Sequence, residues 1–239
     1  MASLFYCTII YVTLQIELFL NKRITITFFF ALLFAAAFSQ ERFSIASDVS
    51  IQRNFKKEQQ YWAVGHTTHA VFHLTPKDGI YLWFAYYSNG RFQNSLNATA
   101  KSALTLPQQI HYTNSGRMRL KQFSVGWRKY LKGTPDSESK WNVYGYAGFG
   151  LLLGRIDNVH SLTIDTAAYT LPVRSGKANF KRLTVDLGVG WEAPIGGDFY
   201  FYTEGRVWIP TTDYPSDYLF VNDNAPFVAM LCTGIRIIF

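Results

Sequence analysis

One short segment of the chain contains the residue types of a nucleophilic catalyst. Ser88 lies within the run Tyr86–Gly90, and two histidines, His66 and His69, come before it in the chain. A serine hydroxyl becomes a nucleophile only when a general base lies beside it. The sequence does not place either histidine next to Ser88. We therefore expect a non-catalytic protein and keep an enzyme as an alternative.

A second set of residues is charged and falls at alternate positions of strand-like segments. Both signs occur on the faces opposite the apolar ones: Asp48, Arg128, Arg182, Asp186, Glu192, Glu204, Arg206 and Arg236. A buried charge without a partner is costly, so we expect these side chains to pair into a network. We interpret this network as a salt-bridged plug, and an ion path is the alternative.

A third set consists of lysines and arginines in or beside polar connecting segments. We expect contacts to phosphate groups of a partner from Lys56, Lys57, Arg117, Arg119, Lys121, Arg174 and Lys177. Cationic side chains bind phosphate groups well. Ordinary solvated loop charge is the alternative. The last polar connection is acidic instead, with Asp213, Asp217 and Asp223.

Several other kinds of site are excluded by the composition. The net charge of +7 is spread along the chain without a basic helix, so we expect no nucleic-acid partner. The two cysteines, Cys7 and Cys232, lie far apart in the sequence. No metal-ligand spacing, phosphate loop or dinucleotide fingerprint occurs, so we expect neither a metal nor a cofactor.

The scaffold for these residues is predicted by strict alternation of apolar with polar or small residues. Such alternation indicates strands with two unlike faces. Only 16% of the chain is charged, whereas a soluble domain usually carries about 25% charge. The eight alternating segments are Phe43–Arg53, Trp62–Leu74, Ile80–Tyr87, Phe123–Tyr130, Trp141–Gly154, Arg182–Glu192, Phe199–Ile209 and Phe227–Phe239.

The lengths of these segments indicate a membrane-spanning barrel. Most approach the roughly 9–11 residues that a tilted strand needs to cross a bilayer. An open sheet in lipid would leave backbone groups at its edges without partners, so the segments must close. Short turns alternate with the long polar connections 88–116, 155–180 and 210–226, as in outer-membrane barrels. We predict an all-β, antiparallel, up-and-down transmembrane barrel with eight strands.

Two details of this barrel are left open by the pattern. Ten strands would form if Ser102–Tyr112 added a hairpin. Met118 and Leu120 fall in the parity opposite to that of Phe123. We therefore expect a bulge near them, or the end of the membrane span.

The first 39 residues are predicted to be removed from the mature protein. Lys22 and Arg23, the apolar run 24–36 and the sequence Ala37–Ser39 form the pattern of a secretory signal. The mature protein would begin at Gln40, and the barrel domain would cover residues 40–239. No cysteine follows the cut, so we expect no lipoprotein anchor. We interpret residues 1–20 as an upstream extension from a misassigned start codon. An extended signal or an uncleaved helix is the alternative.

The last segment supplies the residues of an assembly signal. Gly234, Ile237 and the terminal Phe239 are similar in spacing to the C-terminal signal that the barrel-assembly machinery reads. Together with the alternation and the signal peptide, they give a chain that resembles small bacterial outer-membrane β-barrels of the outer-membrane protein A/X type. Nothing follows Phe239, so the likeness is to the X type, a barrel alone.

This resemblance implies a location and a set of partners. The location is the bacterial outer membrane, reached by signal-dependent export, and the partners are outer-membrane lipid and lipopolysaccharide. The barrel would be a monomer. Eight strands also leave an interior just wide enough for side chains to fill.

Three functions are compatible with the sequence. The leading interpretation is a non-catalytic surface barrel that acts in envelope integrity or in surface interaction through its outer loops. The run Tyr86–Gly90 also resembles the His-x-Ser-Asn motif of the lipid A deacylase family, but Tyr86 stands where that family has histidine. A lipid A-modifying enzyme and a narrow pore are the alternatives.

Overall fold

The computed structural model describes residues 43–136, 140–212, 216–219 and 228–239. The predicted signal segment, the cleavage site before Gln40, and Asp213 and Asp223 of the acidic connection lie outside these residues. In the described part of the chain, no helix is long and apolar enough to cross a membrane.

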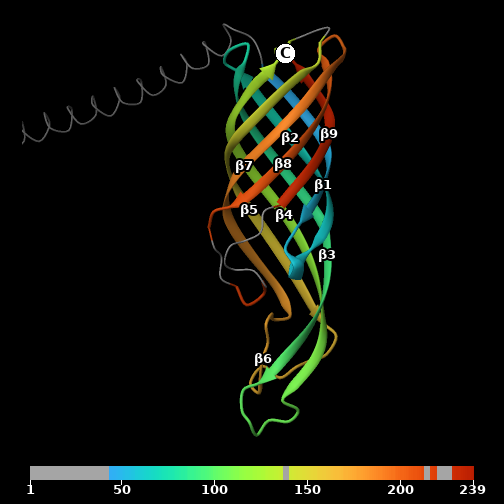
Figure 1. Ribbon diagram of the computed structural model, residues 1–239, viewed down its shortest axis with the longest axis vertical. Helices are drawn as coiled ribbons and strands as arrows, with labels where there is room; N and C mark the ends of the chain where they lie inside the picture. Colours follow the sequence, from blue (N-terminus) through green and yellow to red (C-terminus); the bar gives the residue numbers. More distant parts are fainter. Residues whose placement is uncertain (1–42, 137–139, 213–215, 220–227) are drawn as a thin grey trace, which may run out of the picture. The chain divides into compact units, whose positions relative to one another are not determined.

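Strands make up most of the described chain (Figure 1). Their bounds are β1 Phe43–Asn54, β2 Tyr61–His73, β3 Asp78–Ala100, β4 Gln109–Lys132, β5 Asn142–His160, β6 Tyr169–Thr170, β7 Gly176–Gly196, β8 Phe199–Pro210 and β9 Val228–Ile238. A single 3-10 turn, η1 Lys57–Gln59, lies between β1 and β2.

Eight strands of the described chain form a closed antiparallel ring. Their order is β2-β1-β9-β8-β7-β5-β4-β3, and pairing of β2 with β3 closes the ring. The short β6 only pairs with Thr99 and Ala100 of β3. The predicted eight-stranded, all-β barrel is thus confirmed. The hairpin considered within Ser102–Tyr112 does not form, because residues 101–108 are the loop between β3 and β4.

The barrel has two unlike ends. The turn end holds the short connection between β2 and β3, the one between β7 and β8, and Phe239; it is uppermost in Figure 1. The loop end holds the connections from β3 to β4 and from β5 to β7. In barrels of this kind the short turns face the periplasm and the longer loops face outward. By that rule the loop end would be the outer end.

Four strands continue at the loop end beyond the other four. β2 pairs with β3 only as far as Val64 and Ser88, and β8 pairs with β7 only as far as Pro210 and Thr184. Beyond these points β3, β4, β5 and β7 run on as a four-stranded sheet, which we call the extension (Figure 1).

The extension corrects the predicted outer connections. Most of residues 88–116 are paired strand rather than loop, because β3 runs to Ala100 and β4 begins at Gln109. The connection predicted at 155–180 is also shorter, since β5 ends at His160 and β7 begins at Gly176. In these parts of β3 and β4 most outward side chains are polar, and large apolar ones such as Phe92 and Tyr112 face inward. A search for outward apolar faces therefore does not detect the strands.

Near Met118 and Leu120 a bulge or the end of the membrane span was expected, and β4 itself has no bulge there. That strand pairs continuously with β5 through this stretch. The register shift lies instead in β3, between Tyr87 and Gly90, where Asn89 adopts a left-handed backbone with a φ of 64°. Met118 and Leu120 are buried inside because the parity of β4 is unbroken.

Candidate functional site

The outer face of the barrel carries a belt of exposed apolar side chains on all eight ring strands. This apolar belt comprises Ile45, Val49, Ile51, Val64, Phe72, Leu82, Phe123, Val125, Phe149, Leu151, Leu183, Leu187, Val189, Phe201, Ile209, Leu231 and Ile235. Soluble proteins rarely expose so large an apolar surface. It matches the lipid-facing band of a transmembrane barrel.

The residues of the predicted assembly signal lie on β9 and just beyond it, at the turn end. Gly234 pairs with Asp48, and Ile237 pairs with Ile45 on one side and with Phe199 on the other. The amide of Phe239 donates a 2.8 Å hydrogen bond to the carbonyl oxygen of Phe43. The Phe239 ring is 67% exposed, on the outer face of the barrel.

The centre of the lumen holds an ion cluster of four side chains from three strands, β1, β4 and β8. Arg206 Nη2 lies 2.8 Å from Asp48 Oδ2, and Arg206 Nε donates to Glu204 Oε2 at 2.6 Å. Arg128 Nη2 donates to Glu204 Oε1 at 3.0 Å. All four side chains are buried. Each carboxylate therefore has a guanidinium partner, which offsets part of the cost of burying charge.

Aromatic and histidine side chains complete this cluster. Tyr144 donates to Glu204 Oε1 at 2.6 Å, and Tyr202 donates to Asp48 Oδ2 at 3.0 Å. His69 Nε2 lies 3.2 Å from Asp48 Oδ2. None of these three residues was predicted to belong to the network. Their signal was the inward parity that they share with the charged residues.

A second ion cluster closes the turn end. Arg236 donates to both carboxylate oxygens of Glu192, at 3.0 and 2.8 Å, in a bidentate pair. Tyr130 and Asn142 each donate to Glu192 at 3.0 Å. Arg236 also donates to the carbonyl oxygen of Pro135, at 2.8 Å, so the connection after β4 is tied across the mouth of the barrel.

The two remaining candidates of the charge network are held differently. Asp186 accepts hydrogen bonds from Gln122 at 2.7 Å, from Thr184 at 2.8 Å and from Ser124, and in the described residues no cation forms an ion pair with it. Arg182 lies nearer the loop end, where its Nη1 donates to the carbonyl oxygen of Thr212 at 3.3 Å. The expected pairing therefore does not extend to Asp186, which neutral donors hold.

Tyrosine rings fill the space between the charged clusters. The ring of Tyr146 covers Gly188, where an added Cβ would lie 2.2 Å from the Cζ atom of Tyr146. Tyr144 covers Gly190 in the same way, at 2.3 Å. Nearer the loop end, Met118 and Leu152 help to line a remaining cavity of about 40 Å³. The lumen is packed with side chains at each of these levels.

Within the described part of the chain, no hydrogen bond joins Ser88 to a histidine. Ser88 pairs in register with Val64, and His66 pairs with Tyr86. Nδ1 of His66 lies 3.0 Å from the Asp48 carbonyl oxygen, and its Nε2 lies 3.0 Å from the hydroxyl of Thr68. Among the described residues, no group of three or more His, Cys, Asp or Glu could hold a metal ion.

The candidate lipopolysaccharide contacts fall into two groups. Lys56 and Lys57 lie in the connection between β1 and β2, and Arg174 lies just before β7, where its Nε is 3.2 Å from Asp217. Arg117, Arg119, Lys121 and Lys177 instead lie on strands of the extension or at its base. These four were expected in or beside polar connections; Lys177, which fell within the predicted connection 155–180, lies on β7, because the strands continue beyond the belt.

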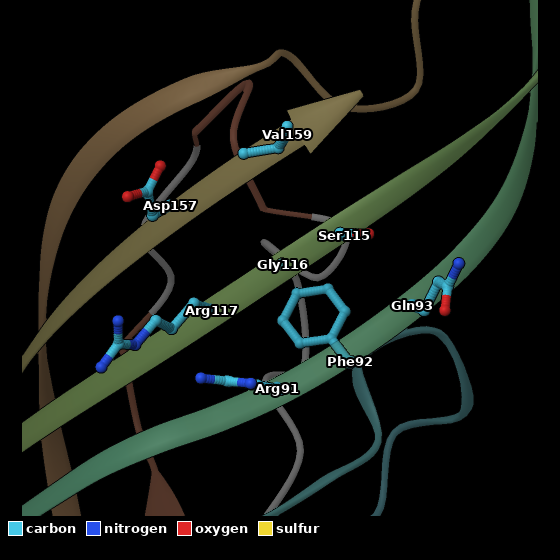
Figure 2. Close-up of a pocket in the computed structure, with 8 residues that line it drawn as sticks. All are labelled: Arg91, Phe92, Gln93, Ser115, Gly116, Arg117, Asp157 and Val159. Carbon is cyan, nitrogen blue, oxygen red and sulfur yellow. The ribbon is translucent and has the colours of Figure 1, made fainter. Parts of the chain in front are cut away.

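The outer face of the extension gathers most of these strand cations. Together with three neighbours they form what we call the cationic face, which consists of Arg91, Arg117, Arg119, Lys121, Arg155 and Lys181. One groove on it, of about 610 Å³, is lined by Arg91, Arg117 and Asp157 among others (Figure 2). A second groove of about 550 Å³ is lined by Arg119, Lys121, Arg155 and Lys181 together with Tyr86 and Leu153.

Comparison with known proteins identifies the fold. No protein-family model matches the sequence, and no curated protein matches it significantly. The solved structure of neisserial surface protein A shares 11% identity over 84% of this chain and 100% of its own, with a TM-score of 0.50. A major outer membrane protein from Thermus thermophilus shares 13% identity over 83% of this chain and 98% of its own, with a TM-score of 0.52.

At these identities the comparison shows the fold alone. The fold is that of the eight-stranded outer-membrane β-barrels. The likeness to barrels of the outer-membrane protein A/X type, predicted from the sequence, is confirmed at this level.

Proposed function

We propose that this protein is a non-catalytic barrel of the bacterial outer membrane that acts at the cell surface through its extension. The apolar belt supports a membrane location, and the two ion clusters with their tyrosines support a lumen that conducts poorly. Export would use the predicted signal peptide. Assembly would use Gly234, Ile237 and Phe239, and the barrel would work as a monomer among outer-membrane lipids and lipopolysaccharide.

The continuation of four strands beyond the other four is the observation that carries this proposal. A barrel that served only to span the membrane would need no sheet above the belt. On the side away from β4, β2 pairs with β3 only as far as Ser88 and β6 pairs with it only at Thr99 and Ala100, so in the described residues no strand pairs there with Gly90–Gln93 or Ser95–Ala98. Unpaired strand edges offer backbone donors and acceptors to an extended segment of another chain. Surface interaction through this edge is therefore the function that the geometry favours.

The experiment for this proposal shortens the extension. Arg91 pairs directly with Arg117, so residues 92–116 can be replaced by an Asn-Gly turn that suits a two-residue hairpin. The control keeps these strands and replaces only the loop 101–108 with glycine and serine. Both proteins should show the heat-dependent gel shift of a folded barrel.

The readouts are made in a deletion strain that expresses each variant. Adhesion of cells to surfaces and to one another should be lost with the shortened protein and kept with the loop control. Resistance to large antibiotics, which reports envelope integrity, should be restored by both. If the shortened protein restores adhesion as well as the wild type does, the extension is not the functional part.

The pore alternative is tested separately in planar bilayers. The wild-type barrel should give no stepwise conductance, because Arg206, Glu204 and Arg128 occupy the centre of the lumen together with tyrosine rings. Regular single-channel steps from the purified, folded protein would show that the barrel is a pore and that its lumen is not closed.

A further inference from the structure

We infer that the cationic face is a binding site for the phosphate groups of lipopolysaccharide in the outer leaflet. This inference rests on the proposed membrane location and orientation. It concerns the outward side chains at the base of the extension. It does not involve the strand edge through which the extension is proposed to act.

The arginines of this face lie directly opposite one another across strands. Arg91 on β3 is in register with Arg117 on β4, and Arg119 on β4 is in register with Arg155 on β5. Like charges directly opposite in an antiparallel pair destabilise the sheet. Two such pairs on adjacent strands are therefore unfavourable by themselves. An anion bound between the guanidinium groups would remove the repulsion.

Few acidic side chains are placed to neutralise these arginines. The acid in register with Arg117 is Asp157, which lies on β5 and whose carboxylate is 3.8 Å from Lys177 on β7. Arg117 donates to the side-chain oxygen of Asn89, a neutral acceptor. In register with Arg155 on its other side is Asn179, also neutral. The cations of the face thus outnumber its acids.

The chemistry of these residues suits phosphate. A guanidinium presents its donors in a planar fork that can bind two phosphate oxygens at once. Both grooves of the cationic face lie over these side chains. Figure 2 shows Arg91, Arg117 and Asp157 beside the groove of about 610 Å³. The groove of about 550 Å³ brings Arg119 and Arg155 together with two lysines.

The position of the cationic face relative to the apolar belt indicates a lipid ligand. The cross-strand row Phe84, Phe123, Leu151 and Leu183 is the last apolar row before the cations. The next outward row is Tyr86, Lys121, Leu153 and Lys181, followed by Arg119 and Arg155. Charges one row above a lipid-facing surface meet the headgroup region. On the outer side of this membrane, that region holds the lipid A phosphates of lipopolysaccharide.

The mixed lining of the second groove fits the same ligand. Leu153 and Tyr86 are 37% exposed and lie between the cations. Lys121 Nζ lies 6.0 Å from the centre of the Tyr86 ring. The groove can therefore take the upper end of an acyl chain beside a phosphate. Free inorganic phosphate would use only the cations.

The test compares a patch variant with a matched control. The patch variant is Arg119→Gln, Lys121→Gln, Arg155→Gln and Lys181→Gln, and the control, at the opposite end of the barrel, is Lys77→Gln, Lys129→Gln, Lys132→Gln and Lys140→Gln. Both sets remove the same number of exposed charges. Each folded protein, in uncharged detergent at low salt, is titrated with lipid A bearing two phosphates. Lipid A without phosphates, phosphatidylglycerol and inorganic phosphate are titrated in parallel.

The patch variant should bind bisphosphorylated lipid A about tenfold or more weakly than wild type, and the difference should shrink at high salt. The control should stay within about twofold. Equal affinity of the patch variant and the wild type would overturn the inference. Equal wild-type affinity for phosphatidylglycerol or inorganic phosphate would overturn the assignment to lipopolysaccharide.

A second variant separates binding from a structural role. Arg155→Gln removes one member of a like-charged pair, so without ligand it should unfold at the wild-type temperature or above. It should gain less than wild type from added lipid A, because a ligand stabilises in proportion to its affinity for the folded state. An equal drop in unfolding temperature with and without lipid A would mean that Arg155 is structural.

Failure of this inference is distinguishable from failure of the proposed function. The protein shortened between residues 92 and 116 keeps Arg119, Lys121, Arg155 and Lys181, so it should bind lipid A and lose adhesion. The patch variant should do the reverse, with adhesion kept and lipid A binding weakened. A patch variant that loses adhesion but binds lipid A normally contradicts the inference only.

Discussion

The belt and the extension are parts of the same strands, but they are built with opposite faces. In β4, Phe123 and Val125 face outward within the belt, and Arg128 faces the lumen. A few residues along the same strand, Arg119 faces outward and Leu120 faces inward. The backbone parity does not change between these positions. What changes is the medium outside the sheet, from lipid to water.

This difference shows that charge has a different role on each side of the sheet. Inside the belt, Asp48, Glu204 and Glu192 are each held by at least one guanidinium. Outside the extension, Arg119 and Arg155 oppose one another without an acid in the same row. A buried charge must find its partner within the fold, whereas an exposed one can leave that position open to a ligand.

Removal of Arg206 should have the largest effect. Arg206→Met leaves the carboxylates of Asp48 and Glu204 without their shared guanidinium, and it should lower the free energy of unfolding by about 3–5 kcal/mol. The matched change in the loops is Arg174→Met, which breaks an exposed pair with Asp217 and should cost less than about 1 kcal/mol. Urea titration of both proteins in lipid vesicles measures the difference. Equal losses in the free energy of unfolding would show that the buried pairs of the lumen stabilise the protein no more than the exposed pair in the loops does.

A charge on the outer face should be costly in the belt and tolerated in the extension. Leu187→Arg places a cation against lipid and should cost about 2–4 kcal/mol. Val159→Arg changes an outward residue of the extension that is 62% exposed, and it should stay within about 0.5 kcal/mol. The heat-dependent gel shift after folding into vesicles compares them. If Leu187→Arg folds as well as Val159→Arg, the belt does not face lipid.

The extension should also respond to pH through His160. Burial lowers the pKa of His160 below its ordinary value of 6.5, and its ring packs on Tyr112 with centroids 4.7 Å apart. As the pH falls, His160 is therefore protonated in the unfolded chain at a higher pH than in the folded protein. The stabilisation is therefore complete above pH 6.5 and is lost as the pH falls towards the lowered pKa.

Hydrogen exchange measures this pH effect. Amides of residues 109–116 should be less protected at pH 5 than at pH 7.5, after correction for intrinsic exchange rates. Amides within the belt should not change, and His160→Gln should remove the difference. A pH response that persists in His160→Gln would assign it to another group.

The smallest effect is expected at the boundary between the two regions. Ser88 lies at the register shift of β3, and His66 is hydrogen-bonded to other groups. Ser88→Ala should therefore leave the acylation of lipid A unchanged. Mass spectrometry of lipid A from cells that express each form makes the comparison. Loss of an acyl modification with Ser88→Ala would favour the enzyme over the surface barrel.

The sequence predicted the belt better than the extension. Alternation marked all eight ring strands and the inward face of Asp48 and Arg206, because lipid outside and a crowded lumen inside impose unlike residues at successive positions. The same rule failed for residues 88–116. Most outward residues of this stretch are polar, and its buried apolar side chains are Phe92, Ala98 and Tyr112. Without knowledge of the pairing partners, this pattern resembles that of an irregular loop.

The sequence by itself determined the strand period, the closure of the barrel and the sign of each inward charge. Those properties follow from local rules, namely the two-residue repeat of a strand and the need to pair every backbone group in lipid. Only the tertiary structure decided that Arg236 pairs with Glu192, that Asp186 is held by neutral donors, and that Arg119 faces Arg155. These contacts depend on the register between strands distant in sequence, and side-chain alternation repeats every two residues without fixing that register.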